Sequence, residues 1–183
     1  MAKIYKTYIQ QLRFDGRAYA KGSVVDILAD YNVAVMEFPF KKNTKVKSLP
    51  SRDWAGTDGL DVYVPAGNLP VNSYDLEVTF LYVGTENTIR GDLSRFIDFI
   101  CGRRKGGNSD TVQSGRIAVY DEHVGMGRKD VVVSEVDNEL FYCSDFDRDA
   151  VAKFKVKFTV YDPATDVSLS KTNGVVTNLV WQS

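Results

Sequence analysis

The only histidine of the chain, His123, follows Asp121 and Glu122. A single histidine excludes a histidine-based catalytic triad and a metal site built from several imidazoles. A lone metal ligand is conceivable beside these two carboxylates. A histidine in a loop between two strands is the favoured interpretation.

Three aspartates, Asp145, Asp147 and Asp149, match the opening of a calcium-binding loop, in which alternate positions supply oxygen ligands. The rest of that pattern fails. Ala150 stands where the loop needs a glycine, and Val156 stands where it needs a bidentate glutamate. We therefore predict a solvated acidic connection rather than a calcium site.

Two basic segments could contact a polyanion. The first, Gly102–Gly107, contains Arg103, Arg104 and Lys105. It follows a predicted helix, whereas phosphate-binding loops precede one, so we interpret it as a mobile basic loop that could meet an acidic neighbour or passing DNA. The second segment is interpreted as a solvated strand face or a hairpin arm, and its cations are Lys41, Lys42, Lys45 and Lys47.

No other spacing in the chain indicates catalysis. No serine occupies a G-x-S-x-G turn, and paired carboxylates cannot be identified from spacing because they meet in space. Cys101 and Cys143 are far apart and show no CxxC pattern, so we expect reduced thiols. The sequence thus predicts a protein that is not an enzyme, with no catalytic, cofactor-binding or metal-binding residues and no cofactor.

Composition limits the function classes further. A chain of 183 residues with 44% hydrophobic and 26% charged residues is globular rather than disordered. The 23 basic residues against 24 acidic ones remove the electrostatic case for a general nucleic-acid binder. The sequence shows no signal-peptide pattern and no apolar run of membrane-spanning length, so we expect a protein made in the cytoplasm with no membrane partner.

Strands dominate the elements that must position these residues. Two segments alternate apolar and polar residues with a period of two, which predicts strands with one buried face. Their apolar positions are Leu76, Val78, Phe80 and Tyr82, and Phe154, Val156, Phe158 and Val160. We predict shorter strands over 116–120, 131–136 and 139–143, the last two joined by a tight turn at Asp137-Asn138, and a further strand over 60–64. The N-terminal part is less regular: residues 3–14 and 18–27 have strand character, and 32–40 is rich in Val and Phe but ends at Pro39.

One segment follows the helical period instead. Its apolar residues fall on a single stripe, with Asn87 or Thr88 as a possible N-cap and Gly102 as a left-handed end. The stripe consists of Ile89, Leu93, Phe96, Ile97 and Ile100. The predicted fold class is therefore mainly β: two packed antiparallel sheets, as a sandwich or split barrel, with one amphipathic helix. Residues 1–165 are expected to form the domain and residues 166–183 a C-terminal arm or extra edge strand.

This order of elements resembles the N-terminal domain of distal tail proteins of long-tailed bacteriophages, which are related in fold to tail-tube proteins. The resemblance covers about residues 1–165. It is carried by the segment around the turn at Asp58-Gly59, by the helix over 93–100, and by the strand that ends at Asp162-Pro163. The strands over 74–83, 115–121, 139–143 and 154–163 complete it. The long basic loop, the segment 31–50 and the lack of a following carbohydrate-binding-like domain depart from the family pattern.

The resemblance implies a tail-tube-like, non-enzymatic structural subunit of a bacteriophage or prophage tail. Such a subunit would form a homohexameric ring at the distal tail or baseplate, with itself and neighbouring tail proteins as partners and DNA only in transit. It would be located in the virion tail and be made in the host bacterial cytoplasm. The segments 32–50 and 173–183 and the basic loop are the expected arms, and removing 172–183 is expected to weaken assembly more than stability.

Alternatives remain open at this point. The chain could be a tail-tube subunit or another baseplate ring component. Outside phages it could be a carbohydrate-binding β-sandwich module that uses Trp54, Tyr63 and Trp181. An enzyme of an unrecognised type is the third possibility. The mass of the protein in solution separates the first class from the others.

Overall fold

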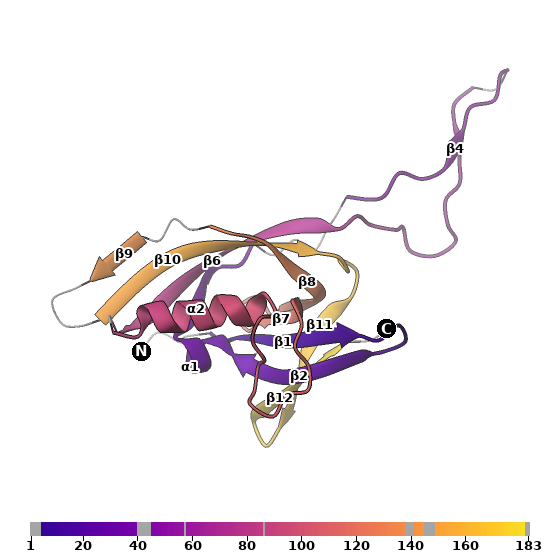
Figure 1. The fold of residues 1–183 in the computed structure, drawn as a ribbon. Coiled ribbons are helices and arrows are strands. Elements are labelled where there is room, and N and C mark those ends of the chain that lie inside the picture. Colours follow the sequence, from indigo (N-terminus) through magenta and orange to yellow (C-terminus); the bar gives the residue numbers. More distant parts are fainter. Residues whose placement is uncertain are drawn as a thin grey trace.

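The computed structural model describes residues 5–39, 45–56, 58–85, 87–137, 141–144 and 149–181. The described chain is mainly β, as the alternating patterns predict, with two helices and a large antiparallel sheet (Figure 1). In chain order its elements are β1 (Thr7–Phe14), β2 (Tyr19–Asp26), α1 (Ile27–Tyr31), β3 (Val33–Glu37), β4 (Ser51–Arg52), β5 (Asp61–Val62), β6 (Tyr74–Thr85), α2 (Ile89–Ile100), β7 (Arg116–Asp121), β8 (Met126–Val136), β9 (Phe141–Ser144), β10 (Asp149–Val160), β11 (Asp166–Thr172) and β12 (Val175–Trp181).

The large sheet has the strand order β2-β1-β7-β8-β10-β6-β3. Its two end strands, β2 and β3, are consecutive in the chain and joined by α1, which brings the two ends of the sheet near each other. Register shifts interrupt the pairings of β1 with β2, β7 with β8 and β8 with β10, and such bulges increase local twist. Hydrogen bonds thus join the main strands into one large antiparallel sheet, which agrees with the expected mainly β fold class. β4 and β5 form a separate two-stranded sheet that is not part of the large one.

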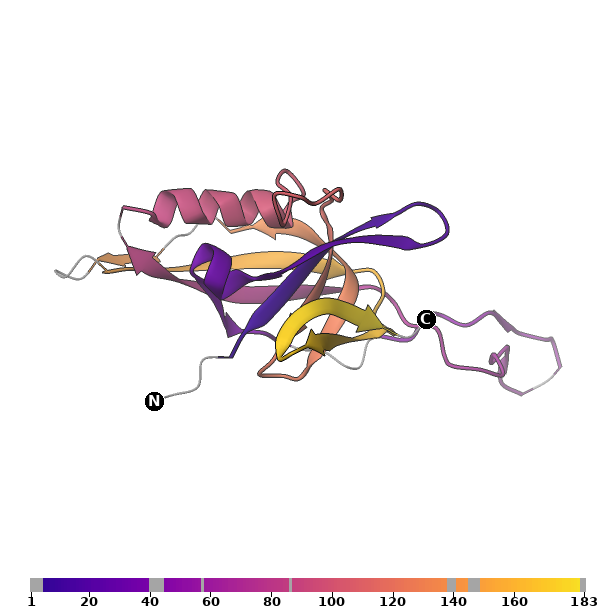
Figure 2. The same cartoon turned by 90° about the horizontal axis from the view of Figure 1, so that it is seen from below.

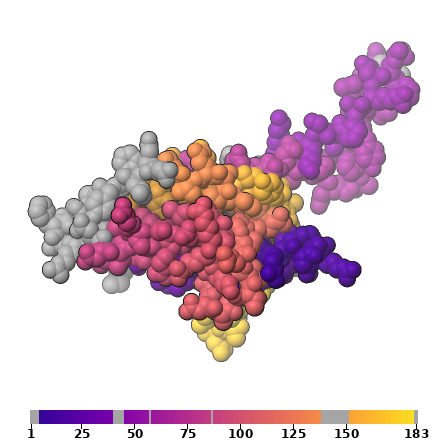
Figure 3. All heavy atoms as spheres, in the orientation of Figure 1, coloured from indigo at the N-terminus to yellow at the C-terminus, as the bar shows by residue number. Residues whose placement is uncertain are grey.

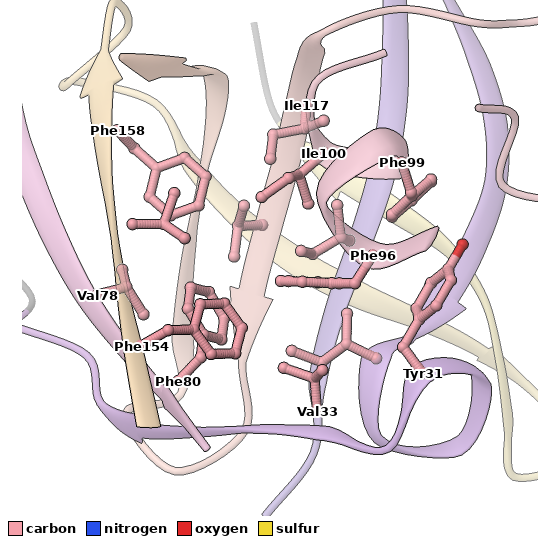
Figure 4. Close-up of a cluster of buried hydrophobic side chains, with 14 of the residues drawn as sticks. Tyr31, Val33, Val78, Phe80, Phe96, Phe99, Ile100, Ile117, Phe154 and Phe158 are labelled. Carbon is pink, nitrogen blue, oxygen red and sulfur yellow. The ribbon is translucent and has the colours of Figure 1, made fainter. Parts of the chain in front are cut away.

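Helix α2 lies across one face of this sheet (Figures 1 and 2). The helix predicted from the apolar stripe is confirmed. The Phe96 ring packs against Phe80 of β6 and Phe154 of β10, with centroid distances of 5.3 and 6.1 Å (Figure 4). These contacts fix the helix to the two longest strands. The buried residues of α2 are Leu93, Phe96, Phe99 and Ile100.

The helix ends as predicted. Gly102 follows it with φ of 74°, a left-handed value that favours glycine. A Cβ added to Gly102 would lie 2.1 Å from the backbone nitrogen of Gly115, so the chain also passes too closely for a side chain. At the other end Thr88 takes the N-cap position without a side-chain capping bond. Its hydroxyl instead lies 2.9 Å from the Tyr82 hydroxyl.

The two alternating strands are confirmed with the predicted faces inward. β6 and β10 pair along twelve residues each, from Tyr74 opposite Val160 to Thr85 opposite Asp149. Their inward side chains form the centre of the main core under α2. These buried residues are Leu76, Val78, Phe80 and Tyr82 of β6, and Phe154, Val156, Phe158 and Val160 of β10.

Two local predictions differ from the structure. Residues Ile27–Tyr31 form a second, short helix, α1, where the sequence predicted only one helix; Asp26 caps its start and Asn32 ends it with φ of 56°. The strands over 131–136 and 139–143 do not pair as a hairpin. β8 and β9 both pair with β10, at successive positions along it, because Asp137 donates its N–H to the Lys155 carbonyl and continues that ladder. Asn138 lies outside the described residues.

The C-terminal hairpin (residues 166–181) consists of β11 and β12, and the start of β11 pairs with β8. It covers a second, smaller core on the side of β1 and β7. Leu179 and Leu12 are both fully buried there. The remaining buried members of this second core are Tyr8, Ala118 and Val167.

Candidate functional site

A long two-stranded arm (residues 45–72) projects from the body of the molecule, at the upper right of Figure 1. Its base is closed by a hydrogen bond from the Asn72 N–H to the Lys45 carbonyl, 2.8 Å long. Farther out, β4 pairs with β5. None of the described residues between Lys45 and Pro70 is buried. Backbone hydrogen bonds, rather than packing on the body, therefore hold the arm together.

The arm carries a concentration of exposed apolar side chains. Fourteen large hydrophobic residues are exposed among the described residues, and seven of them lie on the arm. A monomeric protein rarely leaves such a group uncovered, so a clustered patch indicates an interaction site. The seven are Val46, Trp54, Leu60, Val62, Tyr63, Val64 and Leu69, with exposed fractions between 40% and 67%.

The outer strand of the arm separates its side chains into two faces. Alternation along β5 and its flanks places Leu60, Val62 and Val64 on one face. Asp61 and Tyr63 lie on the other face, and Asp61 pairs in register with Arg52. The arm thus has one aliphatic face and one face that mixes charged and aromatic groups.

The second surface is the outer side of α2, which faces the viewer in Figure 3. An apolar groove (the α2 groove) runs beside the helix, between its exposed flank and β10. Arg90 and Arg103 border it. Its apolar lining residues are Ile89, Leu93, Ile97 and Ala152.

A basic hollow adjoins the α2 groove and shares Arg103 with it. Five cations line the α2 groove and the basic hollow taken together. Two of them are paired: Arg95 with Asp92 and Arg103 with Asp98, each at 3.5 Å. The other three form no ion pair with any described residue, which leaves an excess of positive charge. These three are Arg90 of the groove border and Arg104 and Lys105 of the hollow.

The basic loop (Gly102–Gly107) that forms this hollow was expected to be mobile, but it is anchored to the core. The buried Gln11 amide donates to the carbonyls of Phe99 and Arg104, at 2.7 and 2.6 Å. A Cβ on Gly106 would lie 3.2 Å from both Phe99 and Val25, so the loop backbone packs directly against buried side chains. The backbone that carries Arg103, Arg104 and Lys105 is therefore held in place by the core.

Tyr31 lies at the floor of the basic hollow and is buried. Burial raises the pKa of its hydroxyl, and the nearby Arg104 and Arg95 guanidinium groups oppose that rise. The phenol is accordingly neutral at physiological pH, because its unperturbed pKa is already about 10. Asp30 also borders the hollow, and burial raises the pKa of its carboxyl. Nothing in this set is arranged as a nucleophile with an adjacent base.

The other predicted candidates do not assemble into a site. His123 is exposed in the β7–β8 turn, and its ring packs edge-on against Tyr5 with centroids 4.5 Å apart. The backbone N–H of His123 donates to the Asp121 carboxylate at 2.9 Å, a hydrogen bond that stabilises the turn. Within the described residues no three His, Cys, Asp or Glu side chains could hold a metal ion. Asp145, Asp147, Lys41 and Lys42 lie outside those residues, and β10 begins at Asp149.

The aromatic residues considered for carbohydrate binding do not form a shared platform. Trp54 and Tyr63 belong to the arm, whereas Trp181 belongs to β12. The Lys21 ammonium lies 3.8 Å from the Trp181 ring centroid, and Arg52 covers a face of Trp54 at 3.7 Å. Sugar stacking needs an open ring face, and these two indoles each have a cation over one.

Sequence patterns predicted an arm over 32–50, which overlaps the observed arm at residues 45–50, but they did not indicate residues 51–72 or the α2 groove as interaction surfaces. The signal for the arm was present in the apolar residues at 60, 62 and 64, but it indicated an ordinary strand. The signal for the groove was the position of Ile89 and Ile97 at the margin of the apolar stripe.

No described helix is long and apolar enough to cross a membrane.

No protein-family model matches the chain, and no curated protein matches its sequence at a significant level. Among solved structures, the chain is similar to SPP1 Dit, described as a paradigm of the hub adsorption apparatus in phages that infect Gram-positive bacteria. The two share 15% sequence identity, with a TM-score of 0.47 over 91% of this chain. The chain spans about half of that protein's length, 53%.

Proposed function

We propose that this protein is a non-enzymatic structural subunit of a bacteriophage or prophage tail. It acts by self-association into a homohexameric ring at the distal tail or baseplate, around the channel that DNA crosses. The observation that carries the proposal is the arm, which exposes seven large apolar side chains and buries none of its described residues between Lys45 and Pro70. Such an element gains its packing only when another molecule covers it.

Free strand edges give the same subunit further means of association. Within the described residues, β3 pairs only with β6, and β12 only with β11. A neighbouring copy can complete such an edge by backbone hydrogen bonds, and this also removes a site of unspecific aggregation. In a ring, each subunit would offer one edge and receive another.

The assignment to a phage tail is supported by the order of elements set out from the sequence. In that reading residues 1–165 are the tail-tube-like domain, and residues 166–183 extend it. The proposal places the ring at the distal tail or baseplate rather than in the tube. Neighbouring tail proteins would contact it from above and below.

The charge of the chain fits a channel that DNA only passes through. Twenty-three basic residues against 24 acidic ones give no net attraction for phosphates. Each phosphate that a lining neutralised would add salt-dependent affinity and retard passage. Near-neutrality is therefore the expected balance for a ring that conducts DNA without holding it.

The mass of the full chain in solution tests the proposal. Light scattering over a range of concentrations, followed by negative-stain imaging, is expected to show a closed ring with six-fold symmetry. A strict monomer of 20.5 kDa at every concentration would contradict self-association. Glycan binding that disappears in Trp54→Ala, in a protein that stays monomeric, would favour the carbohydrate-binding alternative.

A further inference from the structure

We propose that the arm of one subunit docks on the outer side of α2 of a neighbouring copy. The aliphatic face of the arm would lie in the α2 groove, and the aspartates near its tip would lie against the basic loop. This inference rests on the proposed function, because it requires self-association, and it names the two surfaces that meet. Two features of the arm match two features of the α2 side.

The first match is apolar. The arm offers Leu60 and Val64, which are 62% and 60% exposed, on the same face as Val62. The groove offers Ile89 and Ile97, both half-buried, over the buried Leu93. A narrow aliphatic strand fits a shallow groove beside a helix better than it fits a flat sheet. Covering both surfaces removes apolar area that each subunit alone leaves in water.

The second match is electrostatic. The outer part of the arm, residues 51–64, carries three aspartates and only one cation, Arg52. The basic loop next to the groove carries Arg104 and Lys105, which form no ion pair with any described residue. Opposite charges at the rim orient two surfaces and accelerate their encounter. The apolar and charged halves adjoin on both surfaces, so a single pose satisfies both. The three aspartates are Asp53, Asp58 and Asp61. Asp61 lies on the opposite face of the arm and pairs in register with Arg52, so Asp53 and Asp58 carry the match.

The partner is a second copy rather than the subunit's own helix. The arm extends away from the body, whereas α2 lies along it (Figures 1 and 3). The arm and the groove are different surfaces of one chain, so their contact is heterologous. Contacts of this type pass from each copy to the next and close into a ring when the rotation allows. The docking thus supplies the geometry that a ring requires.

The test uses full-length variants with substitutions at exposed positions. In the arm variant, Leu60→Ser and Val64→Ser remove apolar contact from the aliphatic face. In the groove variant, Ser94→Arg fills the α2 groove from an exposed helical position that lines it. Each variant alone is expected to associate at least about tenfold more weakly than the unchanged chain, as truncation of a central apolar anchor typically does. Unfolding temperatures confirm that both variants fold.

Mixing the two variants gives the decisive measurement. The arm variant keeps an intact groove and the groove variant keeps an intact arm, so one contact can still form between them. Their mixture should give a 1:1 dimer of twice the 20.5 kDa subunit mass and no ring. A second pair tests the charges: Arg104→Glu with Lys105→Glu should weaken association, and Asp53→Lys with Asp58→Lys on the arm should restore it in the combined variant. The matched control, Arg13→Glu at the exposed end of β1 with Arg17→Glu in the adjacent β1–β2 turn, should associate normally.

The possible results separate this inference from the proposed function. Loss of association in both single variants, with a dimer in the mixture, supports docking on α2. A groove variant and a charge variant that assemble like the unchanged chain, beside an arm variant that does not, overturn docking on α2 but leave self-association intact. An unchanged chain that is monomeric at every concentration overturns the proposed function itself.

Discussion

The Asp110 carboxylate accepts hydrogen bonds from both the hydroxyl and the backbone N–H of Ser23, at 2.5 and 3.0 Å. The same carboxylate also accepts the backbone N–H of Gly107, at 2.8 Å. Ser23 belongs to β2, whereas Gly107 ends the basic loop. One side chain therefore fixes the segment after α2 to an end strand of the sheet and sets the position of the cations beside the α2 groove.

This carboxylate makes the anchor sensitive to acid. Burial alone raises the pKa of Asp110, but the hydrogen bonds from Ser23 and Gly107 outweigh burial and lower it. A lowered folded-state pKa means that the stabilisation is fully present above the unfolded pKa, near 4, and is lost as the pH falls through the folded value. Asp110→Asn should lower the free energy of unfolding by about 1 kcal/mol at pH 7, after allowance for solvent screening.

Chemical denaturation at pH 7 and at pH 2.5 measures this effect. The difference between Asp110→Asn and the unchanged chain should shrink as the pH falls, because the Asp110 carboxylate of the unchanged chain is increasingly protonated and loses its charge. Asp58→Asn, on the arm, serves as the control and should leave both curves unchanged. A difference that stays constant with pH would show that the charge of Asp110 does not matter.

The arm should be dispensable for folding. Lys45 and Asn72 are joined by a hydrogen bond of 2.8 Å, so a two-residue Asn-Gly turn can replace residues 46–71 without stretching the chain. We expect the unfolding temperature to stay within a few degrees, because none of the described residues from Lys45 to Pro70 is buried. Self-association should be lost. A large fall in the unfolding temperature would show that the arm packs on its own subunit.

The Phe96 ring should be the most sensitive position of α2. It is fully buried and contacts the rings of Phe80, Phe154 and Tyr31. Phe96→Ala should reduce the free energy of unfolding by about 3–5 kcal/mol, because truncation of a buried aromatic leaves a cavity. Urea denaturation measures the loss. Phe14→Ala is the matched control, since Phe14 is 49% exposed and the same truncation there should cost much less.

The sequence predicted the elements that carry a strong period. β6, β10 and α2 each repeat apolar residues against one buried surface, and their buried faces follow from those repeats. Helix α1 was not predicted, because its five residues are too few to show a helical period, although Asp26 and Asn32 are typical cap residues. The expected hairpin at Asp137-Asn138 failed because a turn dipeptide competes with the ladder that β10 offers to both strands.

The candidate site could not be predicted in the same way. The arm has no core to face, so its exposed apolar residues resembled those of a half-buried strand. The basic loop and the α2 groove depend on where the chain goes after Gly102. That path is set by contacts of Arg104 with Gln11 and of Asp110 with Ser23, and both partners are distant in sequence. Contacts between distant segments leave no periodic signal. Only the types of the residues, cationic at 103–105 and aliphatic at 60–64, were visible in the chain.

The C-terminal hairpin should contribute to folding more than the sequence indicated. Leu179 is fully buried against the second core, and its N–H donates to the Gln10 side chain at 3.2 Å. Leu179→Ala should therefore reduce the free energy of unfolding by about 2–5 kcal/mol. Removal of residues 172–183 should destabilise the protein at least as much, because it uncovers Leu12.

Val175→Ala on the same strand provides the control. Val175 is 66% exposed, so its truncation should change the free energy of unfolding by no more than about 0.5 kcal/mol. Urea denaturation of the three variants, with light scattering on the same samples, distinguishes folding from assembly. If the truncated chain unfolded like the full chain but no longer associated, the hairpin would act as an assembly arm, and its burial on β1 and β7 would contribute little to the fold.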